Sequence, residues 1–299
     1  MKLKDLITRA AQLEGKKVAV ASAEDEEVLE AVKMAVENNL AQFILIGDKE
    51  QVDFMVKEKN IPQDHITLIH ARSKEQACEI AVKAVRQHEA DVLMKGNIST
   101  SVILKAVLNK EFGLRTEKVL SHAAAFEVNG FEQLLFVTDA AMNIAPDLQQ
   151  KVQIIENTVR IAKSIGITEP KVAPLAAVEV INPAMQATLD AAALTQMNKR
   201  GQIKNCIVDG PLALDNAVSS LAAEHKGIKS DVAGQADILL VPSIEAGNVL
   251  YKSFIYFADA KVGAVIAGAK APIVLTSRSD SAESKLYSIA LAICSSTNH

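Results

Sequence analysis

The fold is decided by the stretch KVAVASAEDEEVLEAVKMAVENNLAQFILIG, residues 17–47. It begins with a β-branched run at 17–22, continues through an acidic segment with helical spacing at 24–39, and ends in a second apolar run at 42–47. A strand, a helix and a second strand are the simplest interpretation of this order. Apolar strands that alternate with amphipathic helices are typical of a parallel sheet covered on both faces. The stretch therefore predicts an α/β fold.

The same alternation extends to both sides of this stretch. Strands are predicted at 66–71 and 91–95, and each is followed at once by a helical segment. Helices and strands alternate again from residue 148 to the last helix. No internal repeat and no Gly/Ser-rich linker interrupts the pattern. Any division into domains must therefore come from crossovers of the chain.

One segment departs from the alternation and suggests where the domains divide. Residues 119–139 contain two strand-like runs joined by Asn129-Gly130, the strongest short signal for a β-hairpin. We predict two α/β domains with mainly parallel sheets, and place the crossovers near Asp139 and Lys270. The first domain then consists of residues 1–139 plus 271–299, and the second of residues 140–270.

Composition excludes several classes of protein. The chain has 299 residues, 49% of them apolar, and a formal charge of -4 with its basic residues scattered, so no basic patch for nucleic acid or anionic lipid is expected. The three cysteines are widely spaced and suggest neither disulfides nor a zinc site. No signal peptide or membrane span is apparent. These features predict a soluble, cytoplasmic enzyme for a small-molecule substrate.

The segment PIVLTSRSDSAESK, residues 272–285, is the most informative candidate for chemistry. An apolar strand ends just before Ser277-Arg278, and a helix follows within a few residues. Such a junction suits a phosphate group, because the helix start presents free N–H groups and an arginine can clamp phosphate oxygens. Ser277 and Ser281 add hydroxyl donors. Asp280, Ser281 and Glu283 also have the chemistry of helix-capping residues, which is the alternative role for them.

Two other strand ends carry polar side chains. In ADILLVPSIEAGNVLYK, residues 236–252, Gly247-Asn248 opens a predicted helix, and Asn248 and Lys252 lie four apart on one helix face. A helix cap and a surface lysine are the alternative interpretation. In VLMKGNIST, residues 92–100, Lys95 ends a strand and Ser99-Thr100 lies at a helix start, where a side-chain cap is the better interpretation for whichever of the two is the N-cap.

The region between the two predicted domains adds further candidates. Asp139 and Asn143 flank the first predicted crossover, where they serve either the site or a turn. His122 lies in an apolar β run, which is more typical of a core histidine than of a general base.

Two of these motifs together carry a resemblance to a known family. Ser277-Arg278-x-x-Ser281 after a terminal strand, and Ala246-Gly247-Asn248-x-x-Tyr251-Lys252 after a strand and a proline, resemble motifs of the phosphate acetyl/butyryl transferases. The resemblance spans essentially the whole chain, and residues 95–100 and 120–147 are more similar to the butyryl branch than to the acetyl branch. The chain departs at Ser284, where acetyl-type members have an aspartate assigned as a base. Asp280 and Glu283 are the nearby carboxylates that stay as candidates for the base.

The resemblance implies transfer of a short acyl group, butyryl in preference, between coenzyme A and phosphate by direct attack of the thiol in a ternary complex. It also implies a fold like that of isocitrate and isopropylmalate dehydrogenases, with the active site in the interdomain cleft. Catalytic roles are then expected for Ser277, Arg278 and Ser281. Substrate-binding roles are expected for Lys95, Thr100, Asp139, Asn143, Asn248 and Lys252.

The expected partners are acyl-CoA and phosphate, both as substrates, with no metal and no bound organic cofactor. The family resemblance suggests a homo-oligomer, and an acyl phosphate product suggests a carboxylate kinase that consumes it. Neither nucleic acid nor a membrane is expected to bind.

Three other functions stay open at this point. A phosphate acetyltransferase would need the same motifs and a smaller acyl pocket. A metal- and NAD-dependent dehydrogenase is disfavoured, because no compact carboxylate motif and no G-x-G-x-x-G sequence after the first strand is present. A non-catalytic protein that binds acyl-CoA or acyl phosphate would keep Arg278 and the flanking serines.

Overall fold

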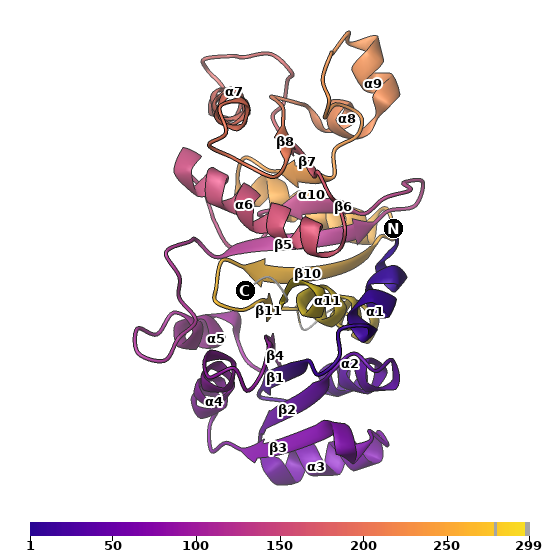
Figure 1. Ribbon diagram of the computed structural model, residues 1–299, viewed down its shortest axis with the longest axis vertical. Coiled ribbons are helices and arrows are strands. Elements are labelled where there is room, and N and C mark those ends of the chain that lie inside the picture. Colours follow the sequence, from indigo (N-terminus) through magenta and orange to yellow (C-terminus); the bar gives the residue numbers. More distant parts are fainter. Residues whose placement is uncertain (278–279, 297–299) are drawn as a thin grey trace. The chain divides into compact units, whose positions relative to one another are not determined.

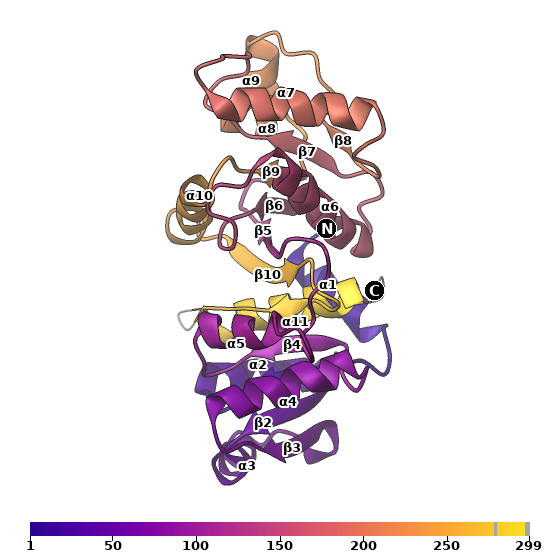
Figure 2. The same cartoon turned by 90° about the vertical axis from the view of Figure 1, so that its left-hand side faces the viewer.

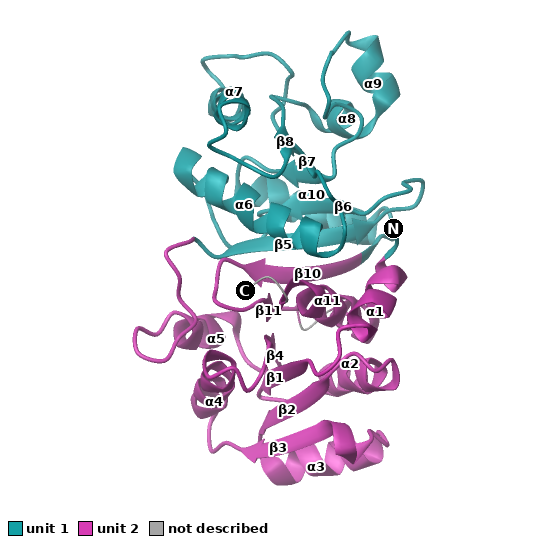
Figure 3. Ribbon diagram, in the orientation of Figure 1, with its two compact units in different colours: residues 1–2, 119–261 teal, residues 3–118, 262–299 magenta. Residues whose placement is uncertain are grey.

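The computed structural model describes residues 1–277 and 280–296. The chain forms two compact units, shown in different colours in Figure 3. We call residues 3–118 plus 262–299 the N-terminal unit and residues 1–2 plus 119–261 the central unit. The domain boundaries expected from the sequence, 139/140 and 270/271, stay a prediction.

The N-terminal unit is built on a sheet whose strands are almost all parallel (Figure 1). In spatial order its strands are β3 (Ile66–His70), β2 (Gln42–Gly47), β1 (Lys17–Ala21), β4 (Val92–Lys95), β11 (Ile273–Val274) and β10 (Lys261–Ala267). Only β10 runs antiparallel to its neighbour β11. The strands β1 and β4 are buried along nearly their whole length, as expected for strands covered on both faces.

Helices cover both faces of this sheet (Figures 1 and 2). One face carries α4 (Lys74–Arg86) and α5 (Thr100–Val107), and the other carries α1 (Leu3–Ala11), α2 (Glu26–Glu37), α3 (Lys49–Glu58) and α11 (Ala282–Ser295). A short 3-10 turn, η1 (Gln63–His65), precedes β3. Asp25, Asp48, Ser73 and Ser281 cap the starts of α2, α3, α4 and α11 through their side chains.

The central unit has a mixed sheet. Its strand order is β5 (Ser121–Glu127), β6 (Leu135–Thr138), β9 (Ile238–Leu240), β7 (Lys171–Pro174) and β8 (Ile207–Val208). The first two strands are antiparallel and the other pairs are parallel. The predicted hairpin is therefore confirmed, and Gly130 in its turn has a φ of 87°.

The helices of the central unit are α6 (Leu148–Ser164), α7 (Gln186–Lys199), α8 (Leu214–Val218), α9 (Ser220–His225) and α10 (Ile244–Tyr256). Two of them, α6 and α10, lie against opposite faces of the sheet (Figure 2). Both units are thus α/β with mostly parallel strands, which confirms the predicted fold class at this level. In the described part of the chain, no helix combines the length and the apolar character needed to cross a membrane.

Candidate active site

The candidate residues fall into two groups, one in each unit. In the N-terminal unit, β4 and β11 are parallel neighbours, with Met94 opposite Val274. The chain therefore leaves the sheet at Lys95 and at Thr276-Ser277 along the same edge, the edge at which parallel sheets bind ligands.

After β11, hydrogen bonds join Ser277 to Asp280. The backbone N–H of Ser277 donates to Asp280 Oδ2 at 2.7 Å, and the N–H of Asp280 donates to the Ser277 carbonyl at 3.2 Å. Arg278 and Ser279 lie between these two residues and outside the described part of the chain. The Asp280 carboxylate is thus engaged by the backbone of Ser277, and this hydrogen bond competes with a role as base.

Ser281 is the N-cap of α11. Its Oγ accepts the N–H of Ser284 at 3.2 Å and donates to Ser284 Oγ at 3.3 Å. The hydroxyl of Ser284 therefore bonds the capping serine at the position where acetyl-type members have an aspartate. Glu283 accepts the Tyr287 hydroxyl at 2.9 Å and so packs along the helix.

Lys285 is a residue that the sequence analysis missed. It lies in the first turn of α11 and is 2% exposed, and its ammonium donates to the carbonyl of Asp280. Among residues 1–277 and 280–296, no carboxylate forms an ion pair with it. A buried cation and a cation at a helix N-terminus are both unfavourable. A lysine that carries both penalties beside the Asp280 carbonyl is a candidate functional residue.

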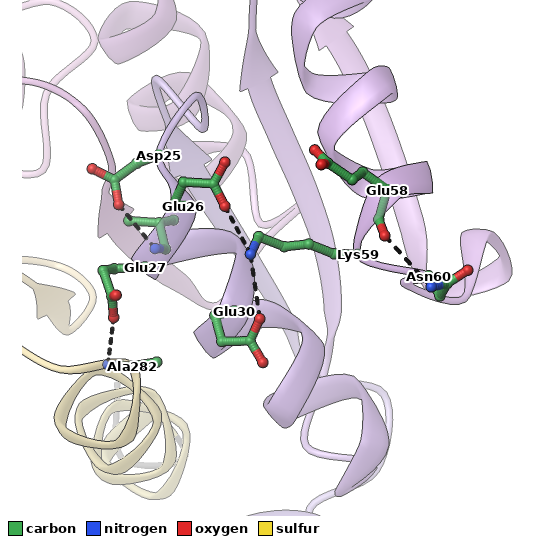
Figure 4. Close-up of polar contacts among 9 residues, drawn as sticks. Asp25, Glu26, Glu27, Glu30, Glu58, Lys59, Asn60 and Ala282 are labelled. Carbon is green, nitrogen blue, oxygen red and sulfur yellow. Dashed lines mark hydrogen bonds and ion pairs between the residues drawn. The ribbon is translucent and has the colours of Figure 1, made fainter.

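A carboxylate from another helix also reaches the start of α11. Glu27 Oε2 accepts the N–H of Ala282 at 3.0 Å (Figure 4). The neighbouring Glu26 points away from α11. Lys59 Nζ forms ion pairs with Glu26 Oε2 at 2.8 Å and with Glu30 Oε2 at 3.3 Å. These two carboxylates raise the pKa of Lys59 above its usual value, with Glu26 contributing most. No local sequence signal could have predicted this contact. Glu27 and Ala282 are far apart in the sequence, and they meet only because α2 packs beside α11.

Lys95 is buried at the end of β4. Its ammonium donates to the carbonyls of Gly96 and Ile98 at 3.3 and 3.1 Å. A Cβ on Gly96 would lie 2.0 Å from the Ser22 carbonyl, so only glycine fits there. Thr100 is exposed as the first residue of α5. The N-cap is Ser99, whose side chain makes no capping bond, so the predicted side-chain cap is wrong here.

The central unit brings Asp139, Asn143 and Asn248 together. Asp139 is 2% exposed, and its Oδ1 accepts the N–H groups of Ala141 and Met142, each at 2.9 Å. Its Oδ2 accepts the backbone N–H of Asn143 at 3.2 Å and the side-chain amide at 2.6 Å. The same amide donates to Leu120 O at 2.8 Å. Asp139 and Asn143 therefore build the loop that follows β6, the turn-forming role that the sequence also allowed.

Helix α10 approaches this loop closely. A Cβ on Gly247 would lie 2.7 Å from the Asp139 carbonyl, so the contact requires glycine. The helix begins at Ile244, not at the predicted Gly247-Asn248, and Asn248 is therefore not its cap. The Asn248 amide donates to Ala140 O at 3.5 Å, while Lys252 is exposed one turn further along.

His122 and Tyr251 belong to the packing of the same unit. His122 is buried in β5, with its ring centroid 5.8 Å from that of Tyr251. Phe126 stacks edge to face on Tyr251 at 5.1 Å. The core interpretation of His122 is thus the better one, and Tyr251 anchors α10 to the sheet.

The cysteines show no sign of nucleophilic activation. Burial raises the pKa of Cys78, Cys206 and Cys294 to about 11 in each case. They are therefore neutral thiols near pH 7, whereas a reactive cysteine has a lowered pKa. Within the described ranges, no group of three or more His, Cys, Asp or Glu side chains is arranged to hold a metal ion.

Comparison with known proteins supports the family that the motifs suggest. The model of the family described as phosphate acetyl/butaryl transferase matches residues 2–79 and 72–293. A probable phosphate butyryltransferase of Bacillus subtilis is 60% identical over 100% of this chain and 99% of its own length. A phosphate butyryltransferase of Clostridium beijerinckii is 51% identical over 96% and 95%.

A solved structure is also similar. The branched-chain phosphotransacylase of Enterococcus faecalis superposes with a TM-score of 0.85 at 36% identity, covering 95% of this chain and 100% of that one. The likeness therefore extends over the fold as well as the sequence.

Proposed function

The chain belongs to the phosphate acetyl/butaryl transferase family, and on that premise we propose that it transfers a short acyl group, butyryl in preference, between coenzyme A and inorganic phosphate. The observation that carries the proposal is the full-length identity of 60% to a probable phosphate butyryltransferase. The branched-chain name of the relative of known structure adds branched acyl groups to the substrates to be tested.

The proposed reaction is a direct transfer. In the direction that consumes acyl phosphate, the thiol of coenzyme A loses its proton and the thiolate forms a bond to the acyl carbonyl carbon. The bond between that carbon and the phosphate oxygen then breaks, and phosphate leaves with the electron pair. Holding both substrates in one ternary complex supplies much of the catalysis. No covalent enzyme intermediate is needed, in keeping with the raised pKa values of the three thiols.

Arg278 is proposed to neutralise the departing phosphate, and Ser277 or Ser281 to donate to the carbonyl oxygen as it becomes anionic. The hydrogen bonds that join Ser277 to Asp280 and cap α11 with Ser281 support this, because they fix both ends of the segment that carries Arg278. Lys95 is proposed to serve the same site from the adjacent strand end, by fixing its loop and adding positive charge.

Residues of the central unit are proposed to bind the other parts of the substrates. Exposed Lys252 and Asn248 would contact coenzyme A or phosphate, and Asp139 with Asn143 would shape the loop against which Asn248 lies. Thr100 of the N-terminal unit is a further substrate contact in this proposal. The dehydrogenase-like arrangement of domains, with the active site in the cleft between them, is part of the same proposal.

The thiol needs little help to ionise. An unperturbed thiol has a pKa of about 8.5, so electrostatic stabilisation of the thiolate is sufficient near neutral pH. Asp280 and Glu283 both accept hydrogen bonds from their own segment, which makes them weak candidates for a base.

Two further parts of the proposal rest on the family alone. The chain is proposed to act as a cytoplasmic homo-oligomer, and its acyl phosphate product to be consumed by a carboxylate kinase.

The test is phosphate-dependent release of free coenzyme A from acetyl-, butyryl-, isobutyryl- and octanoyl-CoA, with no metal or nicotinamide added. Fast release from butyryl- or isobutyryl-CoA and slow release from acetyl-CoA is expected. A preference for acetyl-CoA would make the chain a phosphate acetyltransferase, and no release from any thioester would favour a binding protein. Arg278→Ala should lower kcat roughly 100-fold or more, whereas the exposed Arg115→Ala should not.

A further inference from the structure

A carboxylate from a distant part of the chain occupies the start of α11. Glu27 of α2 is exposed, and its Oε2 accepts the backbone N–H of Ala282 at 3.0 Å (Figure 4). Ala282 is the first residue of α11, so its N–H has no acceptor within the helix. An N–H of this kind, at the positive end of the helix dipole, binds anions. The protein's own carboxylate therefore takes an anion-binding group of α11.

The ion pairs of α2 do not explain this contact. Glu26 and Glu30 of the same helix are both paired with Lys59. Of the lysines and arginines that the structure describes, none forms an ion pair with Glu27. The start of α2 has its own cap, because Asp25 accepts a backbone N–H there. The positive end of α11 is thus the partner that the structure gives to the Glu27 carboxylate.

The start of α11 attracts anions through more than its dipole. The ammonium of Lys285 is buried in the first turn and donates to the carbonyl of Asp280. Two carboxylates accept N–H groups of this segment, Asp280 from Ser277 and Glu27 from Ala282. Both bring negative charge to the place where a phosphate is proposed to bind. A phosphate must therefore share these N–H groups with the two carboxylates or displace one of them.

Of the two carboxylates, Glu27 is the one that a phosphate can displace. Asp280 has a short side chain, and its donor Ser277 lies only three residues away at 2.7 Å. The Glu27 side chain is longer, is exposed and reaches over from another helix. Rotating it into solvent costs little, because water replaces the Ala282 N–H as its hydrogen-bond donor.

We propose that Glu27 competes with substrate phosphate for the start of α11 and so sets the affinity of the chain for phosphate. When phosphate binds, its oxygens take the Ala282 N–H, and the Glu27 carboxylate rotates into solvent. The inference rests on the proposed function in one respect, the binding of phosphate at the Ser277–Ser281 segment. It adds a residue that lowers the affinity for one substrate and needs no contact with the acyl group.

The expected size of the effect follows from the helix start. The stabilisation of an anion at an exposed helix terminus changes a binding constant about 2- to 5-fold. Glu27→Gln removes the charge but keeps an acceptor, so it should tighten phosphate binding by a factor in this range. Glu27→Ala also removes the acceptor and should tighten binding at least as much. A residue that only held α11 in place would have the opposite effect, because its loss would loosen the site.

The first experiment measures phosphate binding without any thioester. Inorganic phosphate is titrated at constant ionic strength, and the rise of the thermal midpoint, followed by circular dichroism, gives the dissociation constant. Asp25→Asn is the matched control, because it removes one charge two residues away and asparagine caps α2 equally well. Both Glu27 variants should bind phosphate more tightly than the wild type, and the control should not.

The second experiment is steady-state kinetics of acyl transfer from butyryl-CoA to phosphate. In Glu27→Gln the KM for phosphate should fall by the same factor as the dissociation constant, and the KM for butyryl-CoA should not fall with it. Tighter phosphate binding in proteins that transfer no acyl group would sink the proposed function and leave the role of Glu27 standing. Three outcomes would overturn the inference: unchanged or weaker phosphate binding in Glu27→Ala, equal tightening in Asp25→Asn, or thermal midpoints that do not respond to phosphate in any of the proteins.

Discussion

Replacing Asp139 by asparagine should show how strongly the loop after β6 depends on one carboxylate. Oδ1 accepts two backbone N–H groups, so the amide oxygen of asparagine should take its place. The new amide nitrogen would then take the place of Oδ2. It cannot accept the hydrogen bonds that Oδ2 receives from the backbone N–H and from the side-chain amide of Asn143. Two hydrogen bonds to a charged, buried acceptor are lost.

The expected cost follows from those two bonds. A hydrogen bond to a charged group contributes about 1.5–3 kcal/mol, so Asp139→Asn should destabilise the chain by about 3–6 kcal/mol. At about 2 °C per kcal/mol this lowers the thermal midpoint by roughly 6–12 °C. Thermal unfolding followed by far-ultraviolet circular dichroism measures the shift.

The matched control is Asp48→Asn, because Asp48 caps α3 and asparagine caps helices equally well. Its midpoint should stay close to that of the wild type. The double variant Asp139→Asn/Asn143→Ala should be less destabilised than the sum of its single changes, since both remove the same bond. A shift for Asp139→Asn no larger than that of the control would refute the reasoning.

Three further outcomes are expected. Gly247→Ala should lower the thermal midpoint, because a Cβ 2.7 Å from the Asp139 carbonyl costs about 1–3 kcal/mol, more than the roughly 1 kcal/mol gained in helix propensity; a midpoint above the wild type's would show that the contact relaxes freely. Lys285→Met should reduce kcat/KM for phosphate by about 10-fold or more, the equivalent of one hydrogen bond, with KM for coenzyme A unchanged and partial recovery in Lys285→Arg. An equal loss toward both substrates would indicate a purely structural lysine. Burial raises the pKa of Cys294 to about 11, so its thiol keeps a proton that the unfolded chain releases at lower pH. Its contribution to stability is then lost as pH rises from about 9 to 11, and urea unfolding of Cys294→Ala should show a shallower alkaline decline than that of the wild type.

The sheets could be predicted because their signals are local. The apolar runs at 17–21 and 42–47 are continuous since both faces of these strands are covered, and Asn129-Gly130 joins strands that pair with each other. Helix starts were less certain. α10 begins at Ile244 because the chain turns at Pro242-Ser243, and the later Gly247 serves a close contact rather than a cap.

The candidate site was predictable as a set of segments but not as a set of contacts. The position of Ser277–Ser281 at a strand end followed from the strand pattern. That Lys285 folds back on the Asp280 carbonyl, or that Glu27 reaches Ala282, depends on how distant helices pack. A lysine in the first turn of the last predicted helix was the one local signal, because such a residue opposes the helix dipole.

The pairing of β4 with β11 has a consequence for how the chain is made. Leu93 pairs with Ile273, about 180 residues later. While the chain is being synthesised, the edge of β4 stays without its neighbour until residues 273–274 have been translated. An unpaired strand edge is a template for aggregation, and pairings of such long range form slowly. The N-terminal unit, although its first strands are translated before the central unit, is thus completed only after the central unit has been made.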